Sequence, residues 1–533
     1  MHSSLVPTFM LLDANQSVVL EAATGNSERN ILLLGYAGTG KTTVAKEIAA
    51  ACPGVVLTSM TVLGAGEAQC RTFSSFLSVF VGEPPHNVDK LFAELLEKPG
   101  SLKHIRDCRT LIIDNASMLT SRMFKLANEL FQQARGNSKL FGGMRLILVA
   151  DPYGSTVPRD IYKYPVQSMP VHFFDSPNFL SDFNGTPFFL ERLYRPLCDL
   201  LSQAVIGSGR GILPIGVLNA LKARCLGAAG DEKSPSLMRY NQFQNLGGTP
   251  RNKKWQLGNI ILCAWSAQAA GIHDSLKKRK ERKKEKFVEF MAKDVVESED
   301  ARAELHEKPA LAKTVFFTEG TQVFLAKDKT LRCSQIGELR DVAGIQSVDF
   351  HKGELAVVVE FFRQDRVGPV RKSGREVWGS FDGVDEKLDG AVLKTRRGYF
   401  VFCALDSETL VAPSGRLQRT QFPFVTAAAI SVPRSVGVSA ENVYLVDSSE
   451  TPPAGFLYSA ISKVKTLENL FFDVSFDIEK YISLPKVAVR DFLHSVFPAR
   501  NLVDMVSRNQ RPAITNDIPA IELGSKRTFD EVE

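Results

Sequence analysis

The segment that most constrains the fold of this chain is NILLLGYAGTGKTTVAKEIAAA, residues 30–51. Its apolar run at 31–34 predicts a buried strand, and its alanine-rich end predicts a helix. The turn between them matches the pattern G-x-x-x-x-G-K-[ST] at Gly35, Gly40, Lys41 and Thr42. Such a turn binds phosphate groups, because loop amides and the positive end of the helix face the same anion. The segment therefore predicts a nucleotide site.

Each residue type in this loop has a chemical task. Glycines let the backbone approach phosphate oxygens without Cβ clashes. Lys41 would reach the β and γ phosphates, and the Thr42 hydroxyl would ligate Mg²⁺. A nucleoside triphosphate and Mg²⁺ are therefore the expected cofactors.

Two later apolar strands end in carboxylates. The run TLIID ends at Asp114, and the run MRLILVAD ends at Asp151. Ligands of open parallel sheets collect at the carboxyl ends of the strands, so Asp114 is a candidate second ligand of Mg²⁺. An apolar strand that ends in Asp is common, so Asp151 alone is a weaker candidate. Three such strands in series predict an α/β fold with a parallel sheet.

Size and composition limit the class of protein. A chain of 533 residues predicts about three or four compact units of roughly 150 residues each. Its 44% hydrophobic and 23% charged residues are typical of globular proteins, and no apolar run has the length of a membrane span. The 8 cysteines lack the paired spacing of a zinc site, and the N-terminus lacks a basic leader. We expect a reducing, intracellular compartment.

Positive charge is concentrated in one segment. The net charge is +6, and LKKRKERKKEK at 276–286 holds much of the excess. This run is interpreted as the solvated face of a helix, with a nuclear-import signal or a phosphate-binding patch as the alternatives. On that basis the nucleus is the expected location, while cytoplasm and mitochondrion stay open.

The order of these segments resembles the superfamily 1B DNA helicases of the RecD and PIF kind. The similarity spans roughly residues 10–475 and is carried by LDANQ, GYAGTGKTT, LTSMTVLGAGEAQCRTFSSF, LIIDNASML, GGMRLILVADPYGSTVP, FFLERLYRP, AISVPRSVGVSAENVYLVD and GFLYSAISKVKTLENLFF. The resemblance implies that Gln16 contacts adenine. It also implies an ATP-binding set of Gln16, Gly35, Ala37, Gly38, Thr39, Gly40, Lys41, Thr42 and Thr43.

The resemblance also implies an architecture of two RecA-like lobes with parallel sheets and a small inserted β domain. Lobe 1 would span 1–187, and lobe 2 would comprise 188–320 and 421–485. The inserted domain would span 321–420, which is rich in short Val and Phe runs, and a polar C-terminal tail would follow at 486–533.

Several positions depart from the family pattern. Asn115 stands where the family has the glutamate that acts as general base, Val436 replaces a glutamine, and Lys463 replaces an arginine that reaches the γ-phosphate. Gly154 also replaces a glutamine, whereas Arg195 matches the second family arginine. Asn115, Arg195 and Lys463 are therefore the catalytic candidates. Because an amide accepts no proton near neutral pH, hydrolysis should be slow unless another carboxylate substitutes, the candidates being Glu67, Glu191 and Asp151.

Residues that face DNA in the family are altered as well. Thr72, Phe73, Phe76 and Arg434 occupy positions that would contact single-stranded or forked DNA. The two phenylalanines would stack on bases, but the alternative is that FSSF is a short helix that buries one face.

The expected function is that of an ATP-dependent DNA helicase, moving 5′ to 3′ by resemblance and serving DNA maintenance, repair or recombination. The alternative is a pseudo-helicase that clamps DNA or a protein partner under control of a bound nucleotide. An unrelated P-loop kinase or GTPase is disfavoured, because no guanine-type motif is present and the later motifs would have no role. No membrane partner is expected.

Overall fold

The chain forms two compact units. Unit 1 comprises Met1–Thr61, Thr72–Ala228 and Asp447–Glu533, and unit 2 comprises Val62–Arg71 and Ala229–Val446. The structure is a computed structural model, and the residues that it describes are 12–25, 27–77, 88–96, 102–155, 172–175, 179–222, 243, 258–282, 288–305, 311–334, 346–362, 390–412, 414–448, 450, 452–473, 476–483, 485, 487–498 and 514–515.

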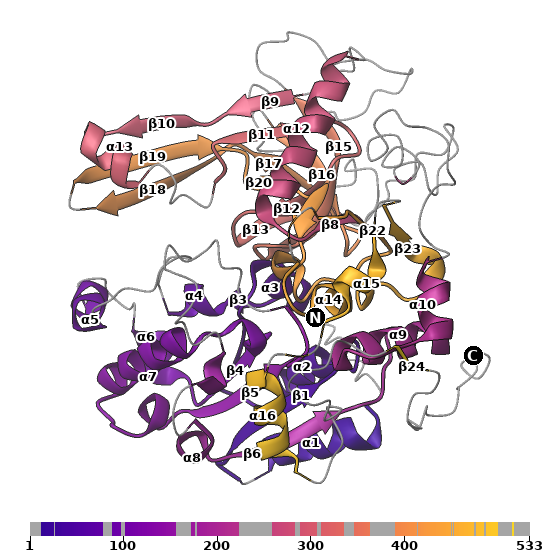
Figure 1. Cartoon of the computed structure of the whole chain (residues 1–533). Coiled ribbons are helices and arrows are strands. Elements are labelled where there is room, and N and C mark those ends of the chain that lie inside the picture. The colour runs from indigo at the N-terminus through magenta and orange to yellow at the C-terminus, as the bar shows by residue number, and fades with distance from the viewer. Residues whose placement is uncertain are drawn as a thin grey trace. The chain divides into compact units, whose positions relative to one another are not determined.

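Unit 1 is built on a six-stranded sheet with the order β3-β2-β4-β5-β1-β6 (Figure 1). β1 pairs in parallel with both β5 and β6, and β4 pairs in parallel with both β2 and β5. The strands are β1 (Asn30–Gly35), β2 (Val55–Ser59), β3 (Arg71–Thr72), β4 (Thr110–Asp114), β5 (Arg145–Ala150) and β6 (Gly185–Leu190). The strand that ends in the phosphate loop therefore neighbours the strand that ends at Ala150.

The central strands of this sheet are buried on both faces, as continuous apolar runs in parallel sheets require. Ile31 and Leu33 belong to one core cluster with Val44 and Ile48 from α2 (Lys41–Ala51) and Val19 from α1 (Ala14–Thr24). Leu32 and Leu34 point to the other face and are equally buried. The other helices and short strands of unit 1 are α4 (Phe73–Phe76), α5 (Val88–Leu96), α6 (Lys103–Asp107), α7 (Ser121–Arg135), α8 (Phe179–Phe183), α9 (Asp199–Arg210), β7 (Leu213–Pro214), α10 (Ile215–Lys222), α14 (Phe456–Ile461), β23 (Leu470–Phe472), α15 (Ile478–Tyr481), α16 (Val487–Val496) and β24 (Ile514–Thr515).

Part of the segment expected to be a polar tail is folded into unit 1. Phe492 on α16 stacks on Phe174 with ring centroids 4.0 Å apart and also contacts Phe173 and Phe179. β24 pairs in parallel with β7. α16 therefore contributes to the core of unit 1, because Phe492 packs against the aromatic rings of α8 and its neighbours.

Unit 2 contains a second parallel sheet, in which β8 (Asn259–Cys263) pairs with β21 (Ala429–Ser431) and β22 (Asn442–Leu445). α12 (Ser266–Arg282) follows β8 directly, and α3 (Val62–Ala68) also belongs to this unit. The first residues of the basic run lie on α12, where Lys277 pairs with Glu289 at 2.5 Å. This placement agrees with the interpretation of the run as a helix face, and residues 283–286 of the run lie outside the described residues.

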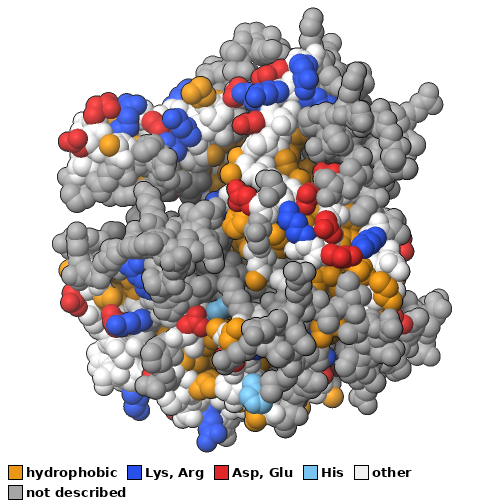
Figure 2. Space-filling model, viewed as in Figure 1, with side chains coloured by type: hydrophobic (Ala, Val, Ile, Leu, Met, Phe, Trp, Pro, Cys, Tyr) orange, Lys and Arg blue, Asp and Glu red, His pale blue; other side chains and the backbone are white. Residues whose placement is uncertain are grey.

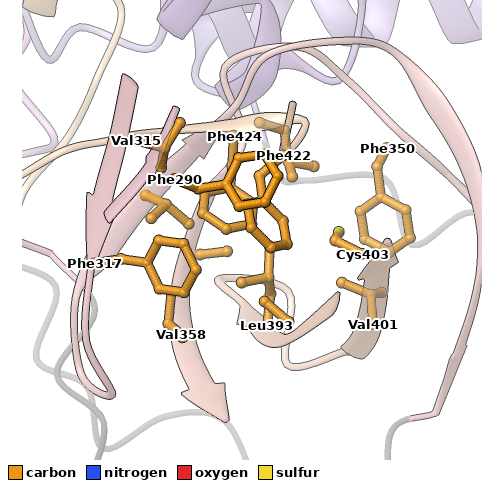
Figure 3. Packing of buried hydrophobic residues seen from close by; sticks show 14 residues of the cluster. Phe290, Val315, Phe317, Phe350, Val358, Leu393, Val401, Cys403, Phe422 and Phe424 are labelled. Atoms are coloured by element: carbon orange, nitrogen blue, oxygen red, sulfur yellow. The ribbon is translucent and has the colours of Figure 1, made fainter. Parts of the chain in front are cut away.

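The rest of unit 2 is antiparallel. A seven-stranded sheet has the order β14-β13-β17-β16-β15-β12-β20, and two smaller sheets have the orders β10-β19-β18 and β11-β9. Its core is aromatic and aliphatic, with Phe317, Phe422 and Phe424 in mutual contact (Figure 3). The elements are β9 (Val288–Met291), β10 (Lys293–Val296), α13 (Glu299–Leu305), β11 (Thr314–Phe317), β12 (Gln322–Leu325), β13 (Lys329–Ser334), β14 (Gln346–Phe350), β15 (Leu355–Phe362), β16 (Gly390–Thr395), β17 (Phe400–Ala404), β18 (Asp406–Ala412), β19 (Gly415–Gln421) and β20 (Phe424–Thr426).

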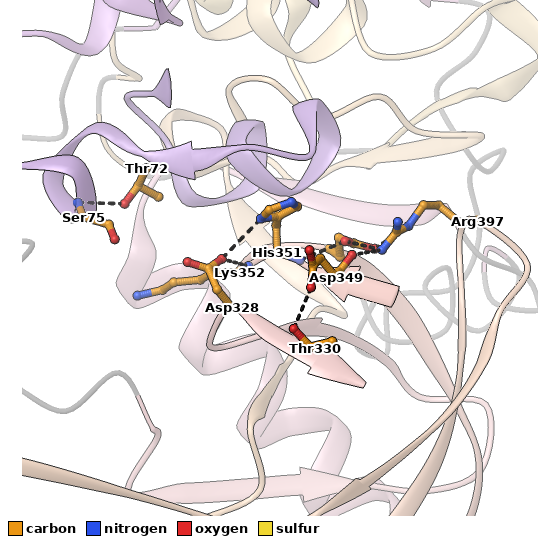
Figure 4. A network of polar contacts seen from close by, with 9 residues as sticks. Thr72, Ser75, Asp328, Thr330, Asp349, His351, Lys352 and Arg397 are labelled. Carbon is orange, nitrogen blue, oxygen red and sulfur yellow. Dashed lines mark hydrogen bonds and ion pairs between the residues drawn. The ribbon is translucent and has the colours of Figure 1, made fainter. Parts of the chain in front are cut away.

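A polar network fixes the turn between β14 and β15. Arg397 donates to both carboxylate oxygens of Glu354, at 2.8 and 3.1 Å, and to the Asp349 carbonyl at 2.8 Å. The Lys352 amide donates to Asp328 (Figure 4). The Arg397 guanidinium also lies 4.6 Å from the Phe350 ring centroid. The bidentate geometry orients Arg397 because its planar guanidinium matches the two carboxylate oxygens.

The boundaries of the units differ from those predicted. Residues 188–228 and 447–485 lie in unit 1 instead of the second lobe, and the antiparallel region begins at β9, before the predicted start at 321. Sequence similarity gave the order of the segments, but the packing partners of α9 and α14 decide where each segment belongs. Within the described ranges, every helix is too short or too polar to cross a lipid bilayer.

Candidate nucleotide site

The phosphate loop joins β1 to α2 through two glycines in the left-handed region. Gly38 has φ 85° and Gly40 has φ 80°, a conformation that costs other L-residues about 1–2 kcal/mol. A Cβ at Gly35 would lie 2.5 Å from the Leu190 carbonyl oxygen, and one at Gly40 would lie 2.4 Å from Nε2 of Gln16. Glycine is therefore required both by backbone conformation and by close packing around the loop.

Lys41 begins α2 and bends back over the loop. Its Nζ donates to the carbonyls of Gly35 and Tyr36, at 2.8 and 2.7 Å. Burial lowers the pKa of Lys41, while the nearby carboxylates of Asp151 and Asp114 act in the opposite direction. The ammonium thus lies between the loop backbone and two carboxylates at the ends of neighbouring strands.

Thr42 and Asp114 meet as the sequence predicts. The Thr42 hydroxyl donates to Oδ2 of Asp114 at 2.8 Å, and the Asn115 amide donates to Oδ1 at 2.8 Å. Burial raises the pKa of Asp114, and the Thr42 hydrogen bond opposes that rise. One hydroxyl and one carboxylate form the oxygen set with which proteins hold Mg²⁺ when phosphates supply further ligands. The Thr42–Asp114 pair therefore fits a Mg²⁺ that shares its remaining ligands with phosphate oxygens. Among the described residues no group of three or more His, Cys, Asp or Glu forms a metal cage.

Asn115 has a left-handed backbone, with φ 56° and ψ 35°. Asn tolerates this region better than most residues because its short side chain bonds locally. Its Nδ2 donates to the Ser59 hydroxyl at 3.0 Å. The side-chain amide of Asn115 is therefore held in place by Ser59. A side-chain amide does not accept a proton near neutral pH, so Asn115 cannot act as a general base.

Gln16 on α1 contacts the phosphate loop. Its backbone amide donates to the Asp13 carboxylate at 2.7 Å, and its Oε1 accepts from the Asp13 amide at 3.1 Å, which forms a capping box at the start of α1. Its Nε2 donates to the Thr39 carbonyl at 3.0 Å. The Tyr194 hydroxyl donates to the same Asp13 carboxylate. Gln16 therefore links α1 to the phosphate loop.

The two cations that are predicted to be catalytic, Arg195 and Lys463, come from later segments. The amide of Arg195 donates to the Gly38 carbonyl at 3.2 Å, and its Nη1 donates to the Ser462 carbonyl at 2.9 Å. The charge of Arg195 also acts on Lys41. Lys463, the next residue after Ser462, is 4% exposed. The structure thus brings Arg195 against the loop and places Lys463 in the same unit.

Sequence reasoning missed a tyrosine cluster behind the loop. The Tyr458 hydroxyl accepts from the Ala37 amide at 2.6 Å and donates to Oδ2 of Asp151 at 2.8 Å. Tyr36 and Tyr153 stack with centroids 4.9 Å apart, and Arg210 donates to the Tyr36 hydroxyl at 3.0 Å. The available signal was Tyr36, which occupies an unspecified position of the GYAGTGKT pattern. A large side chain at that position needs a packing partner.

The four predicted DNA-binding residues have different environments. Thr72 caps α4 by accepting from the Ser75 amide at 3.1 Å. Phe73 and Phe76 are 0% and 1% exposed, as the alternative of a helix with one buried face expects. Neither ring can stack on a base unless this segment rearranges. Arg434 is exposed in unit 2, on the short helix Pro433–Ser435.

Comparisons with known proteins identify the matching family. The family described as PIF1-like helicase matches residues 11–158. The ATP-dependent DNA helicase PIF1 of Danio rerio is 31% identical over 149 residues, which cover 28% of this chain and 22% of that protein. The ATP-dependent DNA helicase PIF7 of Trypanosoma brucei brucei is 32% identical over 129 residues, which cover 24% of this chain and 13% of that protein. The chain thus spans about a fifth or less of the length of these relatives.

Solved structures are similar over most of the chain. The Pif1 helicase from Candida albicans superposes with a TM-score of 0.69 at 17% identity, covering 91% of this chain and 100% of that one. Pif1 from Bacteroides in complex with ADP-AlF3 and ssDNA superposes with a TM-score of 0.62 at 14% identity, covering 92% and 99%. At these identities the likeness establishes the fold. The predicted α/β class with two parallel sheets and the resemblance to PIF helicases are both confirmed.

Proposed function

We propose that this chain, which carries the PIF1-like helicase segment at residues 11–158, is an ATP-dependent DNA helicase that acts on single-stranded or forked DNA. The observation that carries the proposal is the contact between the Thr42 hydroxyl and the Asp114 carboxylate at 2.8 Å, directly beside Lys41. These are the groups that a triphosphate and its metal require; Lys41 and Thr42 begin α2, and Asp114 ends β4.

The residues of the chain have separate tasks in this proposal. Thr42 and Asp114 would hold Mg²⁺, which when bound neutralises charge on the phosphates. When a nucleotide binds, Lys41 would give up its hydrogen bonds to the Gly35 and Tyr36 carbonyls. Its ammonium would then bind oxygens of the β and γ phosphates. Arg195 would stabilise charge that develops on the γ-phosphate in the transition state.

Hydrolysis is expected to be slow relative to enzymes with a carboxylate beside Asp114. Removing a general base typically lowers the rate by about 10² to 10⁴. The Asn115 side chain can form hydrogen bonds beside Asp114, as it does with Ser59, but it cannot accept a proton from water.

A second function is favoured by the same residue. If no other group accepts the proton, the chain would hold ATP without consuming it and would act as a nucleotide-controlled DNA-binding protein. The fixed Asn115 amide, bound to Ser59 at 3.0 Å, is the observation that favours this alternative.

ATP turnover separates the two functions. Phosphate release would be measured with and without single-stranded DNA for the unaltered chain, Lys41→Ala and Asn115→Glu, and binding of a fluorescent ATP analogue with Mg²⁺ would be measured in parallel. A helicase gives DNA-stimulated release that Lys41→Ala removes. Nucleotide binding without release above the Lys41→Ala level supports the DNA-binding alternative, and failure to bind nucleotide contradicts both.

Strand separation tests the substrate and the direction. Duplexes with a 5′ tail, a 3′ tail or a fork would be incubated with the chain and ATP. The expected result is displacement from the 5′-tailed and forked duplexes only. Displacement from the 3′-tailed duplex alone would contradict the proposed polarity and leave the helicase activity itself intact.

A further inference from the structure

We propose that Asp151 accepts the proton of the attacking water in this chain, in place of a carboxylate beside Asp114. The inference rests on the proposed function, since it assigns a catalytic residue to ATP hydrolysis. It also addresses the position that Asn115 leaves without a proton acceptor.

The sheet order places Asp151 at the phosphate end of the site. β5 lies between β4, which ends at Asp114, and β1, which leads into the phosphate loop. Ala150, the last residue of β5, pairs with Leu34, the residue before Gly35. Asp151 therefore leaves the sheet at the level where the phosphate loop begins, between the loop and the strand that supplies the metal ligand.

The contacts of the carboxylate agree with this position. Oδ2 of Asp151 accepts from the Tyr458 hydroxyl at 2.8 Å, and Oδ1 accepts from the Tyr153 amide at 3.2 Å. The carboxylate also faces Lys41, on which it acts more strongly than Asp114 does. The Gly154 backbone amide also hydrogen-bonds this carboxylate. Because a carboxylate has about four acceptor positions, one position is left for a water molecule. Burial raises the pKa of Asp151, which makes the carboxylate a stronger base.

Gly154 leaves one side of this carboxylate without a covering side chain. A Cβ at Gly154 would lie 3.8 Å from Cγ of Asp151, so any larger residue would pack directly against it. The family resemblance has a glutamine at this position, and the change to glycine makes room for water. Asp151 as a whole residue is partly buried.

The other two carboxylates considered as substitutes have weaker positions. Glu67 lies in unit 2, where it bonds Arg396 at 3.1 Å and the Ser439 hydroxyl at 2.7 Å. Glu191 is exposed and follows the end of β6, at the edge of the sheet on the far side of β1 from β4. Of the three, Asp151 alone lies between β1 and β4.

The chemical step balances without a further reactant. The water oxygen forms a bond to the γ-phosphorus, and one water proton passes to the Asp151 carboxylate. The bond from the γ-phosphorus to the β–γ bridging oxygen breaks, and ADP keeps that electron pair. Asp151 then returns its proton to solvent. Tyr458 is a positioning residue, because its hydroxyl orients the carboxylate without contacting the reacting atoms.

Five variants test the assignment, with DNA-stimulated phosphate release and nucleotide binding as separate readouts: Asp151→Asn, Glu191→Gln, Asn115→Glu, Asn115→Glu combined with Asp151→Asn, and Lys41→Ala. Asp151→Asn keeps an oxygen that accepts from Tyr458 and removes the base, so release should fall by at least about 100-fold with nucleotide affinity within about threefold. Glu191→Gln should lower release far less. Asn115→Glu, combined with Asp151→Asn, should restore release above the Lys41→Ala background by supplying a carboxylate beside Asp114.

The outcomes distinguish failure of this assignment from failure of the proposed function. An unaltered chain with no release above Lys41→Ala overturns both. If the unaltered chain hydrolyses ATP, the assignment alone is overturned by any of three results: Asp151→Asn retains release, Asp151→Asn loses nucleotide binding together with release, or Glu191→Gln is the more damaging change. A fourth result also overturns the assignment: Asn115→Glu raises phosphate release on its own but not in combination with Asp151→Asn. Asp151 would then have a role other than proton acceptance.

Discussion

At the scale of single residues, the site depends on side chains that reach across long sequence separations. Lys41, Thr42 and Asp114 could be predicted because a local pattern of strand, glycine and cation carries its own chemistry. Tyr458 could not be assigned a contact with Ala37, because nothing in a local pattern states which helix packs behind the loop. The local pattern therefore predicted the groups that are expected to contact a nucleotide, whereas tertiary packing determines which groups support them.

Gly40→Ala should damage the nucleotide site. The new Cβ would displace Gln16 Nε2, only 2.4 Å away, and the left-handed backbone at φ 80° would add strain of about 1–2 kcal/mol. We expect weaker binding of a fluorescent ATP analogue and a lower melting temperature. Gly216→Ala on α10 is the matched control, because nothing lies within 4 Å of its added Cβ and it should be neutral or stabilising by up to about 1 kcal/mol. Equal effects of the two changes would contradict the contact.

Tyr458→Phe should lower the free energy of unfolding by about 1–3 kcal/mol, because the Ala37 amide and the Asp151 carboxylate both lose a buried partner. Denaturant titration followed by circular dichroism measures the change. Tyr194→Phe also removes a hydroxyl, but its bond to Asp13 is exposed, so the loss should be well under 1 kcal/mol. A Tyr458→Phe protein as stable as the unaltered chain would show that water replaces the hydroxyl at no cost.

At the scale of elements, the strands that precede the candidate site residues were the most predictable part. Continuous apolar runs ending at Gly35, Asp114 and Asp151 gave three parallel strands, because burial on both faces permits no alternation. The packing of α16 could not be predicted, since the sequence of an amphipathic helix does not state which surface its apolar face contacts. α16 forms because aromatic rings of unit 1 supply that surface.

Phe492→Ala should destabilise unit 1 by about 3–5 kcal/mol, because it removes a buried ring that contacts three other phenylalanines. Thermal unfolding monitored by near-ultraviolet circular dichroism would report the lost aromatic packing. Val487→Ala on the same helix is the control, since Val487 is 47% exposed and should change stability by less than about 0.5 kcal/mol. A small effect of Phe492→Ala would mean that α16 does not contribute to the stability of unit 1.

At the scale of the whole molecule, sequence similarity predicted two parallel-sheet regions and an inserted β region, and the compact units of the structure group the segments 188–228 and 447–485 differently from that prediction. The grouping depends on long-range packing, as when the Leu197 amide donates to the Lys465 carbonyl at 2.7 Å and so ties 188–228 to 447–485. Such a contact between segments more than 260 residues apart leaves no local signature in composition or periodicity. The order of segments was therefore predictable, and their grouping was not.

Charge on the whole molecule gives the last prediction. The net charge is only +6, and on the face shown in Figure 2 Lys and Arg side chains lie beside Asp and Glu side chains. A weak overall field means that DNA affinity should depend on a few local phosphate contacts, each adding about −0.7 to the slope of log affinity against log salt concentration for single strands. Arg434 is exposed and is the predicted DNA contact of unit 2.

Arg434→Ala should therefore weaken binding of single-stranded DNA and make the salt slope shallower by about 0.7. Fluorescence anisotropy of a labelled oligonucleotide, titrated at several salt concentrations, measures both quantities. Arg416→Ala is the control. Arg416 is also a cationic, exposed residue, but it lies on β19 of the β10-β19-β18 sheet and pairs with Glu297. An unchanged slope for Arg434→Ala would place the phosphate contacts elsewhere, whereas an equal change for both variants would show that DNA responds to the total charge of the chain.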